Sequence, residues 1–139
     1  MSTELRLKVE TRHDELDRVS AAIEDFALEA DWPLDLALKV NLALEEVVIN
    51  VMNYGHDDGL HEIDIILTTE EDSLTIEIVD DGRPFDPLHD APIPDVNAEL
   101  EERNIGGLGI HLVRKMMDDV QYRREEGKNR LTLVTSLAK

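Results

Sequence analysis

The chain has 139 residues, of which 42% are hydrophobic and 33% are charged. This length fits one compact domain, and the hydrophobic content excludes wholesale disorder. Fourteen basic residues against thirty-two acidic ones give a net charge of −18. Such a surface repels nucleic acid phosphates and anionic membranes, so neither is expected as a direct partner. A phosphate-bearing ligand would have to be held by local geometry: backbone N–H groups, a metal ion or a well-placed arginine.

Cysteine is absent, which excludes a disulfide framework and thiolate chemistry. No segment approaches the roughly 20 apolar residues of a membrane-spanning helix. The N-terminal stretch MSTELRLKVE lacks the apolar region of a secretory signal. We therefore expect a soluble cytoplasmic protein.

The first half of the chain predicts one strand followed by two helices. Residues 5–10 alternate between apolar and polar side chains, as a half-buried strand does. Residues 13–30 carry apolar side chains at helical spacing. A second helix is expected to begin at Pro33, which suits a first helical turn, and to run to about Tyr54, ending near Gly55.

The second half predicts four strands, one helix and a long irregular segment. Residues 63–69 and 73–81 have the composition of two strands joined by an acidic turn. Residues 82–106 contain four prolines, and so long a loop in a small domain indicates a functional lid or a disordered insert. Residues 106–119 lead from glycines into an amphipathic helix, and a hairpin with its turn near Gly127 follows. This order predicts an α+β fold, with helices packed on one face of one sheet.

Three polar side chains recur on the second predicted helix, which is otherwise strongly apolar. Glu46, Asn50 and Asn53 are spaced by four and three residues, so a helix would place them in one column opposite its apolar face. Ordinary solvation of an amphipathic helix would explain such a stripe. Two asparagines are nevertheless unusual, because each costs roughly a few tenths of a kcal/mol against Lys or Glu. The stripe alone leaves both a solvated face and a binding site open.

The stretch VDDGRPFDP, residues 79–87, ends a predicted strand with two aspartates. Asp80 could accept a hydrogen bond from an exocyclic amine such as that of adenine, and Gly82 would keep the backbone thin beside a flat ring. A plain Asp-Gly turn is the alternative. Phe85 stands among turn-forming residues, where it could anchor the loop against the core.

A glycine-rich segment, NIGGLGIHL at residues 104–112, leads into the third predicted helix. Gly106, Gly107 and Gly109 would let backbone N–H groups approach phosphate oxygens at a helix N-terminus. No GK[ST] follows, so the segment is not a P-loop, and a flexible hinge is the alternative. The histidines show no metal-ligand spacing.

Three motifs, in this order along the chain, are shared with one known family: Glu46-x-x-x-Asn50, Asp80-x-Gly82 and Gly106-Gly107-x-Gly109. They resemble the N, G1 and G2 boxes of the Bergerat-type (GHKL) ATP-binding fold. Within that fold, DDGRPFDP and GGLGIHLVRKMMDDVQY are more similar to the bacterial anti-sigma factor serine/threonine kinases. The resemblance covers about residues 5–138.

The resemblance implies a single histidine-kinase-like ATP-binding domain over residues 1–139. Its fold would be a two-layer α/β sandwich, with a mixed sheet, three helices on one face and an ATP lid at about residues 83–105. The implied activity is that of an ATP- and Mg²⁺-dependent anti-sigma factor serine kinase. Such a kinase phosphorylates an anti-anti-sigma (STAS-domain) partner and sequesters a sigma factor.

Two other functions would use the same ligand-binding residues and stay open. One is a non-catalytic module that binds a protein partner in an ATP-dependent way. The other is the catalytic half of a two-protein histidine kinase. Homodimerisation through the first strand and helix is a further expectation from the resemblance.

The resemblance also implies a role for each motif residue. Asn50 would chelate Mg²⁺, Glu46 would be the general base that takes the proton from a serine hydroxyl, and Asn53 could reach the phosphates or a metal-bound water. An amide oxygen is a hard neutral ligand that suits Mg²⁺. Asp80 would accept from the adenine amino group, and Gly82 would pass beneath the ring.

The glycine-rich segment and its neighbours complete the implied site. Gly106, Gly107 and Gly109 would close the lid over the phosphates, and Arg103 would neutralise charge on the γ-phosphate. A Gly-Thr pair that often closes such sites is replaced here by Gly127-Lys128-Asn129, which makes Asn129 the candidate for the second adenine-side contact.

Overall fold

The computed structural model describes residues 3–54, 61–86 and 113–137. Its elements in chain order are β1 (Thr3–Glu10), η1 (His13–Glu15), α1 (Leu16–Glu29), α2 (Leu34–Tyr54), β2 (Glu62–Thr69), β3 (Ser73–Asp80), β4 (Asp119–Glu125) and β5 (Lys128–Ser136). Each strand or helix expected within these ranges is present. The first helix differs slightly, because it opens with a turn of 3₁₀ helix before α1 begins.

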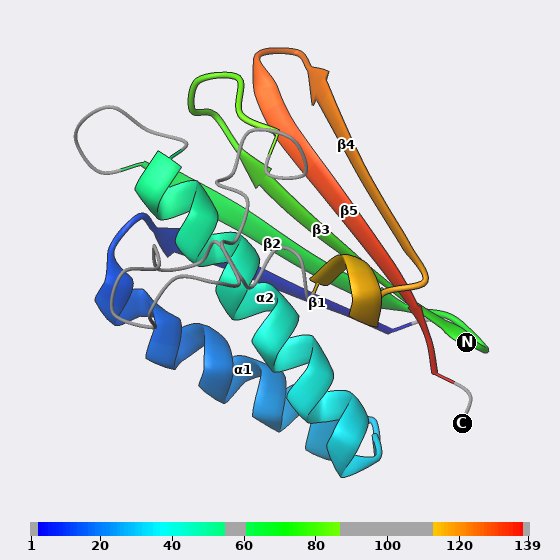
Figure 1. The fold of residues 1–139 in the computed structure, drawn as a ribbon. Helices are drawn as coiled ribbons and strands as arrows, with labels where there is room; N and C mark the ends of the chain where they lie inside the picture. The colour runs from blue at the N-terminus through cyan, green and yellow to red at the C-terminus, as the bar shows by residue number, and fades with distance from the viewer. Residues whose placement is uncertain (1–2, 55–60, 87–112, 138–139) are drawn as a thin grey trace, which may run out of the picture.

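The five strands form one sheet in the order β1-β2-β3-β5-β4 (Figure 1). Every neighbouring pair is antiparallel. The expected α+β class is confirmed, but the expectation of a mixed sheet is wrong for these strands. The cause is that α1 and α2 are antiparallel, so the chain returns to the end of the sheet where β1 finished. Strand β2 therefore begins beside the end of β1 and runs antiparallel to it. The Thr11 N–H accordingly donates to the His61 carbonyl at 2.9 Å.

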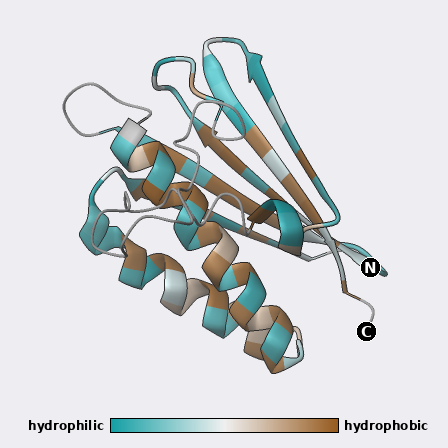
Figure 2. Cartoon of the chain, viewed as in Figure 1, coloured by the Kyte–Doolittle hydropathy of each residue, from teal (hydrophilic) through white to brown (hydrophobic). Residues whose placement is uncertain are grey.

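The structure has two layers, with α1 and α2 on one face of the sheet (Figure 1). Strand side chains alternate between the layers, so that one face of each central strand is apolar. The buried residues of β2 and β3 on this face are Ile63, Ile65, Leu67, Leu74, Ile76 and Ile78. They pack against the buried face of α2, which carries Val40, Leu44, Val47 and Val51. Figure 2 shows hydrophobic stretches along the strands and helices that face each other.

Residues 113–116 are helical and contribute to the same core. Val113 is fully buried and Met117 nearly so. The expected third helix extended to residue 119, but β4 already begins at Asp119 and the Asp118 N–H donates to the Val134 carbonyl. Residues 106–112 of the expected helix lie outside the described residues.

The turn between β4 and β5 lies where it was expected. Glu126 and Gly127 both have positive φ, 53° and 77°, which is the pattern of the two-residue hairpin turns that suit twisted antiparallel strands. Within the described ranges, no helix has the length and apolar character needed to cross a membrane.

The packing of the central strand can be tested with neighbouring residues that face opposite sides. Ile76 is fully buried under the helices, whereas Thr75 is half-buried on the other face. We expect Ile76→Ala to lower the free energy of unfolding by about 2–5 kcal/mol, and Thr75→Ala by less than about 1 kcal/mol. Urea unfolding measures both. Equal losses would contradict the two-layer arrangement.

Candidate functional site

The polar stripe of α2 is buried at one of its three residues. Asn50 is fully buried, Glu46 is half-buried and Asn53 is exposed. The alternative of a solvated face is therefore wrong for Asn50. The reason is that every residue from Val47 to Val51 is buried, so this turn of α2 is enclosed around its whole circumference. A buried amide in such a turn is not explained by solvation.

The Asn50 amide is oriented by its own helix. Its Nδ2 donates to the Glu46 carbonyl at 2.8 Å, one turn earlier. The amide nitrogen makes this bond, and the amide oxygen Oδ1 is the atom of the group that can ligate a metal ion. An oxygen of this kind fits Mg²⁺ without neutralising its charge. The residues present therefore suit the expected metal ion, with Asn50 as the side chain that would hold it.

The Glu46 carboxyl group lies in a position that a merely solvated glutamate would not occupy. Its Oε2 is buried and has no hydrogen-bond partner among the described residues. Burial raises the pKa of Glu46, and the neighbouring Glu45 carboxylate raises it further. Leaving a buried acceptor without a partner costs free energy, so the arrangement is unfavourable for folding alone. A raised pKa suits a group that must take a proton.

Asn53 connects the end of α2 to the first helical turn. Its Oδ1 lies 3.1 Å from Nε2 of His13 in η1, a hydrogen bond in which the imidazole donates when Nε2 carries the proton. The expected contact of Asn53 with phosphates or with a metal-bound water stays a prediction.

Asp80 ends β3 on the face of the sheet that the helices cover. It is 4% exposed, and its Oδ2 accepts a hydrogen bond from the Gly82 N–H at 2.9 Å. Figure 1 shows the C-terminal ends of β3 and α2 at the same end of the molecule. The Asp80 carboxylate and the Asn50 amide thus both lie between the sheet and the helices, toward the same end of the molecule.

Asn129 on β5 faces Asp80 directly in the antiparallel register. Its Nδ2 donates to Asp80 Oδ2 at 3.3 Å and to the Arg83 carbonyl at 2.8 Å. Its Oδ1 accepts from the Phe85 N–H at 3.2 Å and from the Tyr122 hydroxyl at 2.5 Å. One buried amide therefore joins the Asp80 carboxylate, the loop that follows it and strand β4.

Phe85 anchors that loop, as the sequence predicted. Its side chain is 6% exposed and belongs to the main hydrophobic core. The loop is tied down a second time by Arg124, whose Nη1 donates to the Gly82 carbonyl at 2.7 Å. Gly82 is itself buried. The start of the expected lid is thus fixed to the sheet, while residues 87–105 of that lid lie outside the described residues.

Sequence reasoning missed Tyr122 and Arg124. Val120, Tyr122 and Arg124 follow one another at two-residue intervals, so they share the helix-facing side of β4. An arginine on the side of a strand that faces the core is unusual, and it could have indicated a polar site. Burial raises the pKa of Tyr122, which keeps the phenol protonated as a donor. Four further expected site residues, Arg103, Gly106, Gly107 and Gly109, lie outside the described residues.

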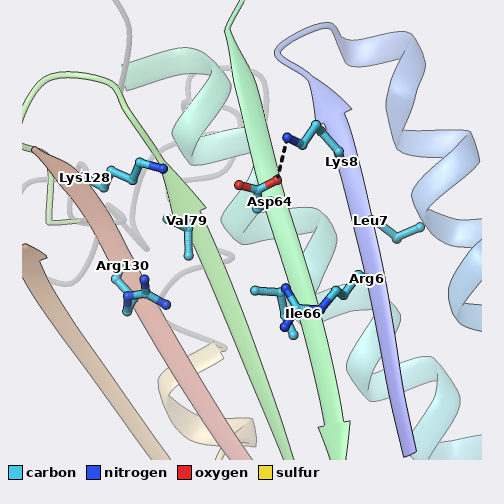
Figure 3. Close-up of a pocket in the computed structure, with 8 residues that line it drawn as sticks. All are labelled: Arg6, Leu7, Lys8, Asp64, Ile66, Val79, Lys128 and Arg130. Carbon is cyan, nitrogen blue, oxygen red and sulfur yellow. Dashed lines mark ion pairs between the residues drawn. The ribbon is translucent and has the colours of Figure 1, made fainter. Parts of the chain in front are cut away.

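A cavity of about 410 Å³ lies on the opposite face of the sheet and contains none of the expected site residues. Figure 3 shows Lys128 and Arg130 along β5 and Lys8 on β1, with Val79 and Ile66 between them. Acidic neighbours balance much of this positive charge. Arg130 contacts Glu77 at 2.6 Å, and Lys8 lies 3.8 Å from Asp64. We therefore place the candidate site at α2, β3 and β5.

Comparison with known proteins shows the family of the chain. Residues 9–135 match the family described as the histidine kinase-like ATPase domain. The chain is 30% identical to the serine/threonine-protein kinase BtrW of Bordetella bronchiseptica, over 84% of this chain and 82% of that protein. It is 28% identical to the anti-sigma F factor of Clostridium acetobutylicum, over 90% of this chain and 85% of that protein.

A third relative is the serine-protein kinase RsbW of Bacillus cereus. The chain is 32% identical to it over 91 residues, which make up 63% of this chain and 57% of that protein. The expected family and the expected protein kinase class are thereby confirmed. The chain belongs to the histidine kinase-like ATPase family, within its group of anti-sigma factor serine/threonine kinases.

Proposed function

We propose that this protein is an ATP- and Mg²⁺-dependent serine kinase that phosphorylates an anti-anti-sigma STAS-domain protein and sequesters a sigma factor. The observation that carries the proposal is the buried Oε2 of Glu46, which has no hydrogen-bond partner among the described residues and lies one helical turn from the buried amide of Asn50. The names of the relatives, serine-protein kinase and anti-sigma F factor, support the choice of reaction and partner.

The adenine end of the nucleotide is assigned to the β3–β5 pair. The Asp80 carboxylate would accept a hydrogen bond from the exocyclic amine of adenine, which guanine does not offer at that position. Gly82 would lie beneath the ring. Asn129 holds the Asp80 carboxylate through its Nδ2, so it would orient the acceptor, and it stays the candidate for a second adenine-side contact.

The phosphate end is assigned to α2 and to the segment after the lid. Asn50 would hold Mg²⁺, which when bound supplies positive charge to the triphosphate. Asn53 would contact the phosphates from the next turn of α2. Arg103 would neutralise charge on the γ-phosphate, and the backbone N–H groups at 106, 107 and 109 would bind phosphate oxygens.

In the transfer step, the serine hydroxyl oxygen would bond to the γ-phosphorus while the bond to the ADP oxygen breaks. Glu46 would take the hydroxyl proton. Phosphoryl transfer needs mainly positioning and charge stabilisation, so a carboxylate within reach of the acceptor is a sufficient base. The free energy that the burial of Glu46 costs the fold would be the cost of this role.

Transfer of a radiolabelled γ-phosphate from ATP to a STAS-domain protein tests the reaction. We expect an acid-stable phosphoserine on the acceptor. An acid-labile phosphohistidine would instead identify a histidine kinase. Partner affinity that depends on ATP, with no transferred label, would identify a non-catalytic module.

Adjacent glutamates provide a matched test of the base. Glu46→Gln should lower the transfer rate by at least about 100-fold and leave ATP binding nearly unchanged, because the amide cannot take a proton. Glu45→Gln changes an exposed neighbour and should retain transfer within about threefold. Single-turnover transfer and ATP calorimetry measure both quantities. Similar rates for the two variants would remove Glu46 from the mechanism.

The pH dependence of transfer follows from the raised pKa of Glu46. The base works only when deprotonated, so the rate should rise with pH through a pKa above the ordinary glutamate value of 4.5. Glu45→Gln removes the neighbouring charge and should move this acidic limb to lower pH. The profile of the single-turnover rate reports the pKa. An acidic limb that Glu45→Gln leaves in place would contradict this coupling.

Substitutions of two asparagines on α2 can distinguish a metal-binding role of Asn50 from an effect on the stability of the helix. Asn50→Ala should weaken ATP binding at least tenfold in the presence of Mg²⁺ and have a much smaller effect in its absence. Asn41→Ala is the control, because Asn41 binds Ser20 of α1 at 2.7 Å and lies away from the stripe. Calorimetry with and without Mg²⁺ makes the comparison. Equal losses with and without the metal would show that Asn50 acts only through packing.

A further inference from the structure

Four leucines are the large hydrophobic side chains that stay exposed in the described part of the chain. Leu28, Leu34, Leu38 and Leu42, here called the leucine ridge, are 80%, 75%, 61% and 40% exposed. Figure 2 shows hydrophobic stretches that reach the end of α2 where it joins α1. A single exposed leucine needs no explanation, but four on one hairpin mark an interaction surface.

The leucine ridge is a continuous surface. Leu34, Leu38 and Leu42 follow one another at intervals of four residues, so they form one stripe along α2. Leu28 is near the end of α1, and it lines a mostly apolar cavity of about 370 Å³ together with Leu34 and Trp32. The ridge and the cavity would accept about three turns of a helix with one large anchor side chain.

The cavity is built from fixed elements. At the end of α1, Asp31 adopts a positive φ of 57°, the Trp32 N–H donates to the Ala27 carbonyl, and the Asp31 N–H donates to the Leu28 carbonyl. This is a Schellman motif, which sets the direction in which Trp32 leaves the helix. The Trp32 ring then lies edge-on to Phe26, with ring centroids 5.6 Å apart. A preformed pocket binds a partner at a lower entropic cost.

The charge around the leucine ridge is mainly negative. Residues 19–38 contain no lysine or arginine, and they contain five exposed acids: Glu24, Asp25, Glu29, Asp31 and Asp35. Glu24 and Asp31 line the cavity itself. Lys39, the first basic residue after this range, donates from Nζ to Thr135 Oγ1 on β5 at 3.0 Å, so it is directed to the sheet. The apolar surface therefore has an acidic border.

The acidic border favours one kind of binding partner for the leucine ridge over the others. Two copies of this surface would bring like charges together, and an anionic lipid surface would be repelled. A helix with apolar side chains on one face and lysine or arginine along its edges would satisfy both the leucines and the border. We propose that the leucine ridge docks a basic amphipathic helix of a partner protein. Leu42 lies one turn before Glu46 on α2, but the proposal uses no property of Glu46, Asn50 or Asp80, so it does not depend on the proposed function.

A synthetic peptide tests the proposal directly. The probe is a helix of about 15 residues made of leucine and lysine, with leucines at i, i+3 and i+4 spacing. Trp32 is the single tryptophan of the chain and lines the cavity, so its fluorescence reports binding at this place. We expect saturable binding that Leu34→Ser with Leu38→Ser weakens at least about tenfold. Ile66→Ser, a half-buried position on the opposite sheet face, should leave the affinity unchanged.

Other outcomes would overturn the proposal. Equal binding by the double variant would mean that charge alone attracts the peptide, and equal binding of a leucine–glutamate peptide would mean that the border does not select a basic partner. Sedimentation that shows a wild-type dimer dissociated by the double substitution would assign the ridge to a second copy. Binding to phosphatidylcholine vesicles that the double substitution abolishes would assign it to a membrane. The altered leucines are exposed, so an unchanged urea midpoint should accompany each comparison.

Discussion

The antiparallel register of β3 and β5 places Asp80 directly opposite Asn129, and the rest of the candidate site depends on this pairing. The Asn129 amide binds the Asp80 carboxylate with one end and holds the following loop at both Arg83 and Phe85. A carboxylate at a free strand end could rotate. Here the hydrogen bonds from Asn129 and Gly82 fix it, so the recognition of a flat amine-bearing ring would begin from a preorganised acceptor.

The second requirement is a polar stripe inside the core of α2. Glu46 and Asn50 have valines as neighbours on α2. Apolar residues at these two positions would cost the fold less free energy than buried polar groups do. The Oε2 of Glu46 is buried without a hydrogen-bond partner in the described part of the chain, and burial raises the pKa of the group, so the fold gives up stability at this position. Perturbed groups of this kind gather at functional sites, and the proposed transfer reaction uses the Glu46 carboxylate as a base and the Asn50 amide as a ligand.

Sequence patterns predicted most of the fold, because the periodicities of α1, α2 and the central strands are strong. They predicted the positions of Asp80 and Gly82 and the anchoring of Phe85. They did not predict that Asn50 is fully buried, since a helical wheel shows direction but not how wide the buried arc of α2 becomes. The sheet direction was also missed, because it depends on where two successive helices return the chain. Tyr122 and Arg124 reach the site through strand pairing over long sequence distances, which a local pattern does not contain.

The two surfaces that the structure offers are chemically distinct. One is the buried polar site at α2, β3 and β5, and the other is the exposed leucine ridge with its acidic border at the α1–α2 junction. The two proposals thus give a chain of charge −18 a locally organised site for an anionic ligand and a surface for a basic partner.

The most direct measurement of the central claim is a crystal structure with Mg²⁺ and a non-hydrolysable ATP analogue. The account predicts the adenine amino group within hydrogen-bond distance of the Asp80 carboxylate, and the metal ion on the Asn50 amide oxygen. A nucleotide bound instead in the cavity beside Lys128 and Arg130, on the opposite face of the sheet, would contradict it.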